Sequence, residues 1–110
     1  MSHLSVLALP ATFLLVMCNT SSVEITVTNK SRYFVTDVSL VAGERLIKAE
    51  DIHPGSSRRV AKWIKGEGAP ILHFRRGSKM VAFETCYYTA GSATHGEVII
   101  LDNDVQRRCH

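Results

Sequence analysis

The chain has 110 residues, of which 45% are hydrophobic and 21% charged, and its formal net charge is +3. This length and composition fit one ordered globular domain and exclude a disordered polyelectrolyte and a strongly basic nucleic-acid-binding protein. A domain of this size buries only about 60–65% of its unfolded surface, so it gains from a covalent cross-link.

The beginning of the chain has the pattern of an export signal. Residues 4–18, LSVLALPATFLLVMC, carry no charge, and polar residues 19–22 follow them. The run is shorter than the roughly 20 apolar residues that a membrane-spanning helix needs. We therefore interpret residues 1–18 as a signal peptide and residues 19–110 as a single β domain.

Two processing routes fit this signal, and a third interpretation needs no processing. Val16 and Cys18 suit positions −3 and −1 of an ordinary cleavage site, which would release a protein that begins at Asn19. Residues 15–18, LVMC, also resemble a bacterial lipobox, in which Cys18 is acylated and attaches the protein to a membrane. The third interpretation is an uncleaved apolar segment packed in the core.

Alternating apolar and polar residues predict strands along most of the remaining chain. Residues 23–28 and 33–41 form the first two predicted strands. The strands after them are separated by the turn signal Pro54-Gly55 and by several glycines. The later predicted strands are residues 45–48, 58–64, 71–74, 79–88 and 96–102. The residues expected to face inward are Val23, Ile25 and Val27 in the first strand and Phe34, Val38 and Leu40 in the second.

About seven short strands without a helical period predict an all-β fold. A small antiparallel β-sandwich of immunoglobulin-like type fits this pattern best, and a small β-barrel is the alternative. The two cysteines that flank a buried tryptophan in immunoglobulin domains are not present at the usual spacing.

The cysteines predict a disulfide bond and, through it, the cellular compartment of the protein. Cys18 lies at the signal boundary, which leaves Cys86 and Cys109 as the predicted disulfide. Such a bridge would contribute roughly 3 kcal/mol by restricting the unfolded chain. It predicts an exported protein in the periplasm or outside the cell, whereas two buried thiols would indicate a reducing compartment.

Catalytic and metal-binding patterns are missing from the sequence. The histidines after the signal are single residues in separate segments, and no His-x-x-x-His or paired-cysteine spacing occurs. No Gly-x-Ser-x-Gly elbow is present. Glu84 lies in an apolar run and would need a basic partner if it faced inward. We expect no cofactor, no metal and no enzyme, and a small hydrolase or metal carrier is the least favoured interpretation.

Arginine pairs and aromatic residues are the candidate binding groups. If the fold brought two arginine pairs together, they would form a cationic patch for carboxylates or phosphates, with aromatic side chains as anchors. Solvated charge, balanced by ten acidic residues, is the simpler alternative. The candidates are Arg58, Arg59, Trp63, Arg75, Arg76, Tyr87 and Tyr88, with Arg107 and Arg108 as a third pair.

One segment resembles a known family. Residues 63–69, WIKGEGA, are followed by a strand and a cysteine, and they resemble the tail of the membrane-bound and periplasmic C-type lysozyme inhibitors. That resemblance implies a small, exported, disulfide-linked β-barrel that inhibits an enzyme. The Ser-Gly-x-Arg-Tyr loop of that family is matched only loosely by residues 55–59, GSSRR.

These observations predict a small exported domain that binds without catalysis. We expect it to recognise a protein or an envelope component, with membrane attachment through Cys18 as an added feature and no role for nucleic acid. The alternative is an inhibitor or immunity protein that inserts residues 55–59 or 65–69 into the active site of an enzyme.

Overall fold

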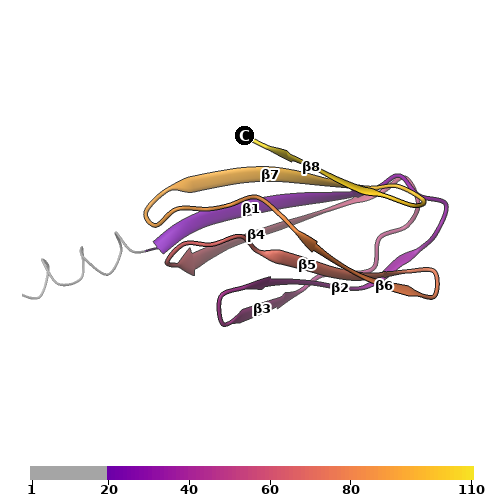
Figure 1. Ribbon diagram of the computed structural model, residues 1–110, viewed down its shortest axis with the longest axis horizontal. Coiled ribbons are helices and arrows are strands. Elements are labelled where there is room, and N and C mark those ends of the chain that lie inside the picture. Colours follow the sequence, from indigo (N-terminus) through magenta and orange to yellow (C-terminus); the bar gives the residue numbers. More distant parts are fainter. Residues whose placement is uncertain (1–19) are drawn as a thin grey trace, which may run out of the picture.

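The computed structural model describes residues 20–110, which form eight strands and no helix (Figure 1). The predicted signal peptide and the acylation of Cys18 lie outside these residues. No helix long and apolar enough to span a membrane occurs in the described part of the chain. The strands are β1 (Thr20–Asn29), β2 (Val35–Ala42), β3 (Arg45–Lys48), β4 (Ser57–Lys65), β5 (Ile71–Arg76), β6 (Lys79–Glu84), β7 (Ala93–Ile100) and β8 (Val105–Cys109).

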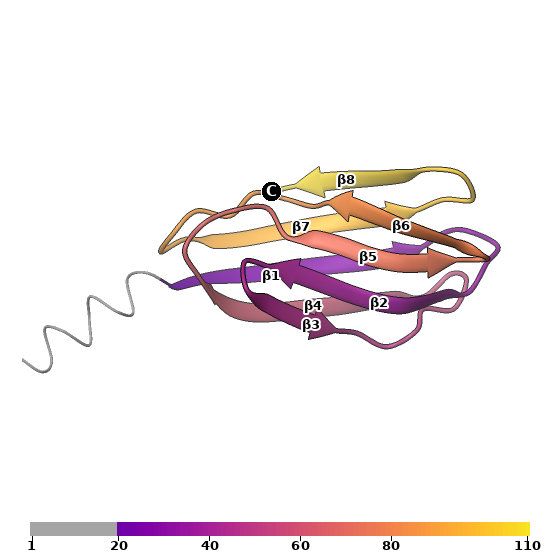
Figure 2. The ribbon, with the colours of Figure 1, turned by 60° about the horizontal axis from the view of Figure 1, so that its bottom comes forward.

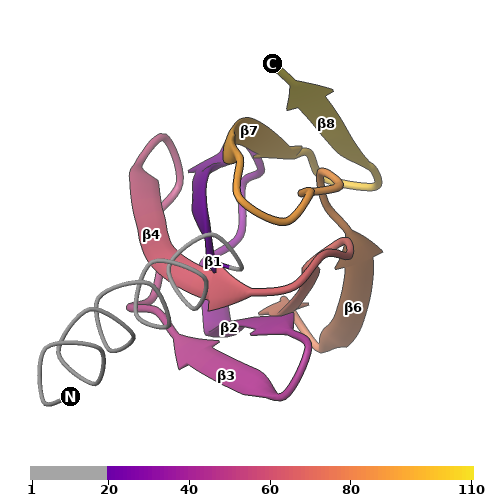
Figure 3. The ribbon, with the colours of Figure 1, turned by 90° about the vertical axis from the view of Figure 1, so that its left-hand side faces the viewer.

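The strands form two stacked four-stranded sheets, with strand orders β4-β1-β7-β8 and β3-β2-β5-β6. Figure 2 shows the second sheet lying over the first, and Figure 3 views the two layers end-on. Every pairing is antiparallel except that of β1 with β7, which is parallel. The predicted β-sandwich is therefore confirmed. The alternative barrel is wrong, because the two sheets do not close on each other.

The core lies between the sheets, and β1 shows how the sequence builds it. Val23, Ile25 and Val27 are at most 1% exposed, as predicted, because successive side chains of a strand point to opposite faces. Val98 and Ile100 of the neighbouring strand β7 are also fully buried. Trp63 is 65% exposed, so this core lacks the buried tryptophan of immunoglobulin domains.

Strand β2 departs from the predicted pattern because it contains a bulge. Asp37 has a φ of 51°, and the pairing of β2 with β5 shifts register between Thr36 and Ser39. The extra residue brings both Val35 and Val38 to the inner face, where they are at most 3% exposed. Phe34 was predicted to face inward, but it precedes the strand and is 55% exposed.

The C-terminal tail forms a strand that the sequence did not predict. β8 pairs with β7 at the edge of the first sheet. The predicted disulfide between Cys86 and Cys109 is present, with an S–S distance of 2.01 Å, and it ties this edge to the segment after β6. Arg107 Nη1 donates to Glu84 O at 2.9 Å beside the bridge. Glu84 itself is exposed and needs no buried partner.

Candidate binding site at the loop end

Four connections between strands gather at one end of the sandwich, which we call the loop end. They are residues 30–34, 49–56, 77–78 and 101–104, and Figure 1 shows them on the right. The opposite end, where β1 begins, is called the N-terminal end. Loops on a rigid sheet framework are common positions for binding residues, so we built the candidate site from these four segments.

Asn29, the last residue of β1, connects the loop of residues 30–34 with the loop of residues 49–56. Its side chain is fully buried. Its Nδ2 donates to Tyr33 O at 2.7 Å and Ile52 O at 2.9 Å, and its Oδ1 accepts from Ser31 N at 3.0 Å and Ser31 Oγ at 2.6 Å. The amide therefore uses both donors and both acceptor positions. A buried and fully satisfied polar network of this kind fixes a single loop geometry.

Asp102 ties the turn after β7 to the loop after β1. Its Oδ1 accepts from Arg32 N at 2.7 Å, and its Oδ2 accepts from Arg32 Nε at 3.1 Å. These hydrogen bonds favour the ionised form, so the pKa of Asp102 lies below its ordinary value. The Arg32 guanidinium also lies 5.8 Å from the centre of the Tyr33 ring, within the range of a cation–π contact.

Arg76 fixes the same turn from the end of β5. Its Nη1 donates to Leu101 O at 2.9 Å and to Asp104 O at 3.2 Å. Its guanidinium lies 6.0 Å from the centre of the Phe74 ring. A guanidinium has five N–H donors, and Nε and Nη2 donate in no hydrogen bond recorded among the described residues. Arg76 can therefore fix the turn and still bind an anion.

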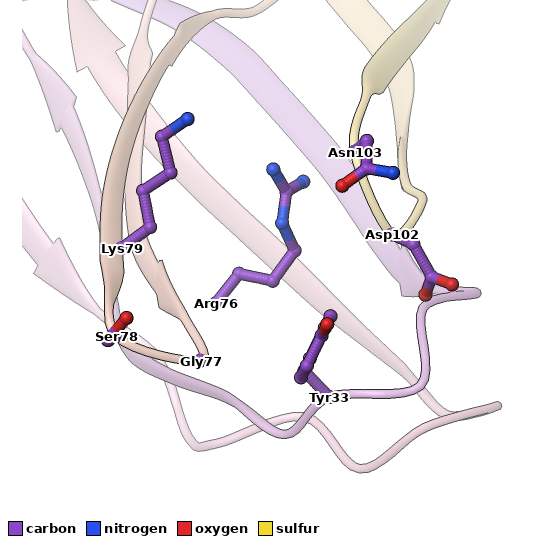
Figure 4. A pocket seen from close by; sticks show the side chains of 7 residues that line it. All are labelled: Tyr33, Arg76, Gly77, Ser78, Lys79, Asp102 and Asn103. Carbon is purple, nitrogen blue, oxygen red and sulfur yellow. The ribbon is translucent and has the colours of Figure 1, made fainter.

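A hollow of about 280 Å³ opens between these loops. Figure 4 shows Arg76 between Lys79 on one side and Asn103 on the other, with Tyr33 below it. Gly77 has a φ of 63°, and a Cβ there would lie 3.6 Å from Tyr33 Cδ1, so the turn packs against that ring. The full lining is Tyr33, Arg76, Gly77, Ser78, Lys79, Asp102 and Asn103.

The chemistry of this hollow suits binding. Arg76 and Lys79 provide two cations that can hold a carboxylate or another oxyanion, while the one lining carboxylate, Asp102, is already paired with Arg32. Within residues 20–110, no group of three or more histidines, cysteines or carboxylates is placed to hold a metal ion.

Exposed aromatic side chains lie at the same end. Tyr33 is 40% exposed and Phe34 is 55% exposed. The Phe34 ring packs at 4.8 Å from the His53 ring, measured between ring centres, so it is held in place although it faces solvent. Exposed and positioned aromatic residues commonly anchor a partner.

The two members of each of the first two predicted arginine pairs have different partners, because neighbouring residues of a strand point to opposite faces. Arg59 Nε lies 2.6 Å from Glu24 Oε1, whereas Arg58 Nε lies 3.6 Å from Glu50 Oε2. The second pair separates in the same way: Arg75 binds Asp37 at 3.2 Å, and Arg76 holds the turn after β7. Among the predicted arginines, Arg76 alone lines the hollow at the loop end.

The predicted aromatic residues lie elsewhere. Trp63, which is 65% exposed, and Tyr87, which is 58% exposed, belong to segments at the N-terminal end. The expectation for Tyr88 is wrong, because it is 2% exposed in the core and cannot touch a partner. Burial also raises the pKa of Tyr88. The sequence analysis missed Tyr33 and Phe34, although two aromatic residues after the turn at residues 29–31 were an available signal.

Comparisons with known proteins address the fold and family. A family model described as "Domain of unknown function (DUF8725)" matches residues 15–107. No curated protein gives a significant match. The solved structure titled "NMR structure of the protein from Eubacterium rectale" is similar with a TM-score of 0.56 and 12% sequence identity, over 80% of this chain and 87% of that chain. At this identity the likeness shows a shared fold alone.

Proposed function

This chain belongs to the DUF8725 family, and we propose that it is a small, exported, non-enzymatic binding domain whose loop end holds a protein or envelope partner. The observation that carries the proposal is the cross-linking of the loops by Asn29, Asp102 and Arg76. Because these contacts order the loops in advance, less conformational entropy would be lost when a partner binds.

The chemistry of the loop end suggests what the partner offers. Tyr33 and Phe34 present apolar surface, and Arg76 and Lys79 present positive charge beside it. A protein surface or an envelope component that combines an apolar group with a carboxylate or another anion would complement both features.

Export is the second part of the proposal. The disulfide between Cys86 and Cys109 suits an oxidising compartment, and the apolar run at residues 4–18 suits an export signal. Mass spectrometry of the intact protein from its native source tests this part. The mass distinguishes acylation of Cys18, cleavage after Cys18 and an uncleaved chain, and the uncleaved chain with reduced thiols would contradict export.

The alternative of an enzyme inhibitor has weaker support. Gly55 N donates to Asn29 O at 2.7 Å, which holds residues 55 and 56 against the body of the sandwich. Arg58 and Arg59 belong to β4 and have acidic partners, so they do not occupy a protruding loop tip. The open sandwich also differs from the closed barrel that the resemblance to lysozyme inhibitors implied.

Capture of the partner from an envelope extract tests the binding part. The protein is immobilised in its wild-type form, as the double variant Tyr33→Ser/Phe34→Ser, and as Leu46→Ser. Leu46 is 59% exposed on β3, and Leu46→Ser therefore removes exposed apolar surface away from the loop end. We expect a component that the wild type and Leu46→Ser retain and the double variant loses. Equal retention by all three would contradict the proposed site.

A further inference from the structure

The N-terminal end of the sandwich carries an exposed tryptophan beside the beginning of the described chain. Trp63 is the single tryptophan of the protein and is 65% exposed. In the pairing of β1 with β4, Trp63 lies opposite Ser22, and Lys65 lies opposite Thr20. Lys65 and Trp63 are therefore fixed next to the first residues of β1.

A hollow of about 520 Å³ adjoins Trp63 at this end. Its charged lining residues are Arg45, Lys65 and Glu44, which leaves an excess of one positive charge. Arg45 Nη1 donates to Trp63 O at 3.4 Å, so the arginine is held beside the end of β4. A tryptophan with basic neighbours is the combination that membrane interfaces and anionic lipid headgroups favour.

The length of chain that precedes β1 limits how far this end can lie from a membrane. Ser22 follows Cys18 by four residues, and four extended residues span at most about 14 Å. A lipid on Cys18, or insertion of the apolar residues 4–18 into a bilayer, would therefore hold Trp63 close to the headgroup layer.

We propose that the N-terminal end of the sandwich rests on an anionic bilayer surface, with Trp63 among the headgroups and Arg45 and Lys65 beside acidic lipid. The loop end then points away from the membrane, because β1 runs the length of the sandwich between the two ends (Figure 1). This inference depends on the export part of the proposed function but not on the partner of the loop end.

The fluorescence of Trp63 tests the proposal without an added label. The full chain is reconstituted into vesicles of phosphatidylcholine alone and of phosphatidylcholine with phosphatidylglycerol. In the anionic vesicles, we expect emission at shorter wavelength, quenching by brominated lipid and weaker quenching by aqueous iodide. Lys65→Gln should lower the ratio of docked to undocked domain about fivefold, as expected for the loss of one cation near the surface. Lys30→Gln, the same change at an exposed position of the loop end outside the hollow, should leave this ratio unaltered.

Three results would overturn the inference. Trp63 could remain as accessible to iodide in sedimented anionic vesicles as in buffer, which would mean a tethered but undocked domain. The emission could shift with protein concentration in the absence of lipid, which would assign Trp63 to contact between copies. Lys65→Gln and Lys30→Gln could weaken docking equally. Capture by the loop end uses no vesicles, so a failure here is distinguishable from a failure of the binding proposal.

Discussion

Replacing Asn29 by alanine should destabilise the protein and loosen the loop end together. The change removes four side-chain hydrogen bonds, three with the loop after β1 and one to Ile52 O in the loop before β4. It leaves the backbone of β1 able to pair with both of its neighbours, so its effect reports on the buried network.

The size of the effect follows from which partners are left unsatisfied. Ile52 O keeps the hydrogen bond from Val35 N. Tyr33 O lies 3.2 Å from Ser31 Oγ and can accept the hydroxyl proton that no longer goes to Asn29 Oδ1. Ser31 N loses its acceptor. Net contributions of about 0.5–1.5 kcal/mol per hydrogen bond, with one buried N–H left unpaired, give a loss of about 3 kcal/mol in the free energy of unfolding.

Urea unfolding followed by circular dichroism measures this loss. The matched control is Thr28→Ala in the preceding position, which removes a single exposed hydrogen bond to Ser57 Oγ at 2.9 Å and should cost less than about 1 kcal/mol. If Asn29→Ala costs no more than Thr28→Ala, the network does not organise the loop end and the reasoning is refuted.

Three further substitutions test the framework by the same urea titration. Cys86→Ala/Cys109→Ala should lower the free energy of unfolding by about 3 kcal/mol under oxidising conditions, because the bridge closes a separation of 23 residues; no loss would contradict the bridge. Gly96→Ala should cost about 1–3 kcal/mol, because its Cβ would lie 2.6 Å from Cys86 Sγ; a neutral effect would show that β7 has room. The pKa of Asp102 lies below its ordinary 3.8, so its ionised form stabilises the protein above that pH, and this stabilisation is lost as the pH falls through the lowered pKa. Asp102→Asn should remove this dependence of the free energy of unfolding on acid pH. An unchanged pH profile would contradict the role of Asp102.

The inward faces of the regular strands could be predicted from the sequence, but interruptions of the two-residue period could not. β1 follows strict alternation, so its buried residues were found directly. In β2 the bulge at Asp37 inserts one residue and reverses the expected face of Phe34. Asp37 adopts a positive φ. Aspartate takes this conformation more readily than most non-glycine residues, but an aspartate at a polar position of an alternating run does not by itself indicate a bulge.

Features that depend on contacts between distant segments were also beyond prediction. The parallel pairing of β1 with β7 joins strands far apart in the chain. β8 contains little apolar sequence and is held by backbone pairing with β7 and by Cys109. The loop end depends on both strand pairings. Asp102 reaches Arg32 only when the turn between β7 and β8 lies beside the end of β1.

The affinity of the captured partner for two single variants tests the binding account most directly. Isothermal titration with the wild type, Phe34→Ala and Leu46→Ala compares two exposed apolar side chains, one of them at the loop end. A central anchor contributes about 2 kcal/mol or more, so we expect Kd to rise about 30-fold for Phe34→Ala and to stay within about twofold for Leu46→Ala. A partner that binds Phe34→Ala as tightly as the wild type would contradict the loop end as the binding site.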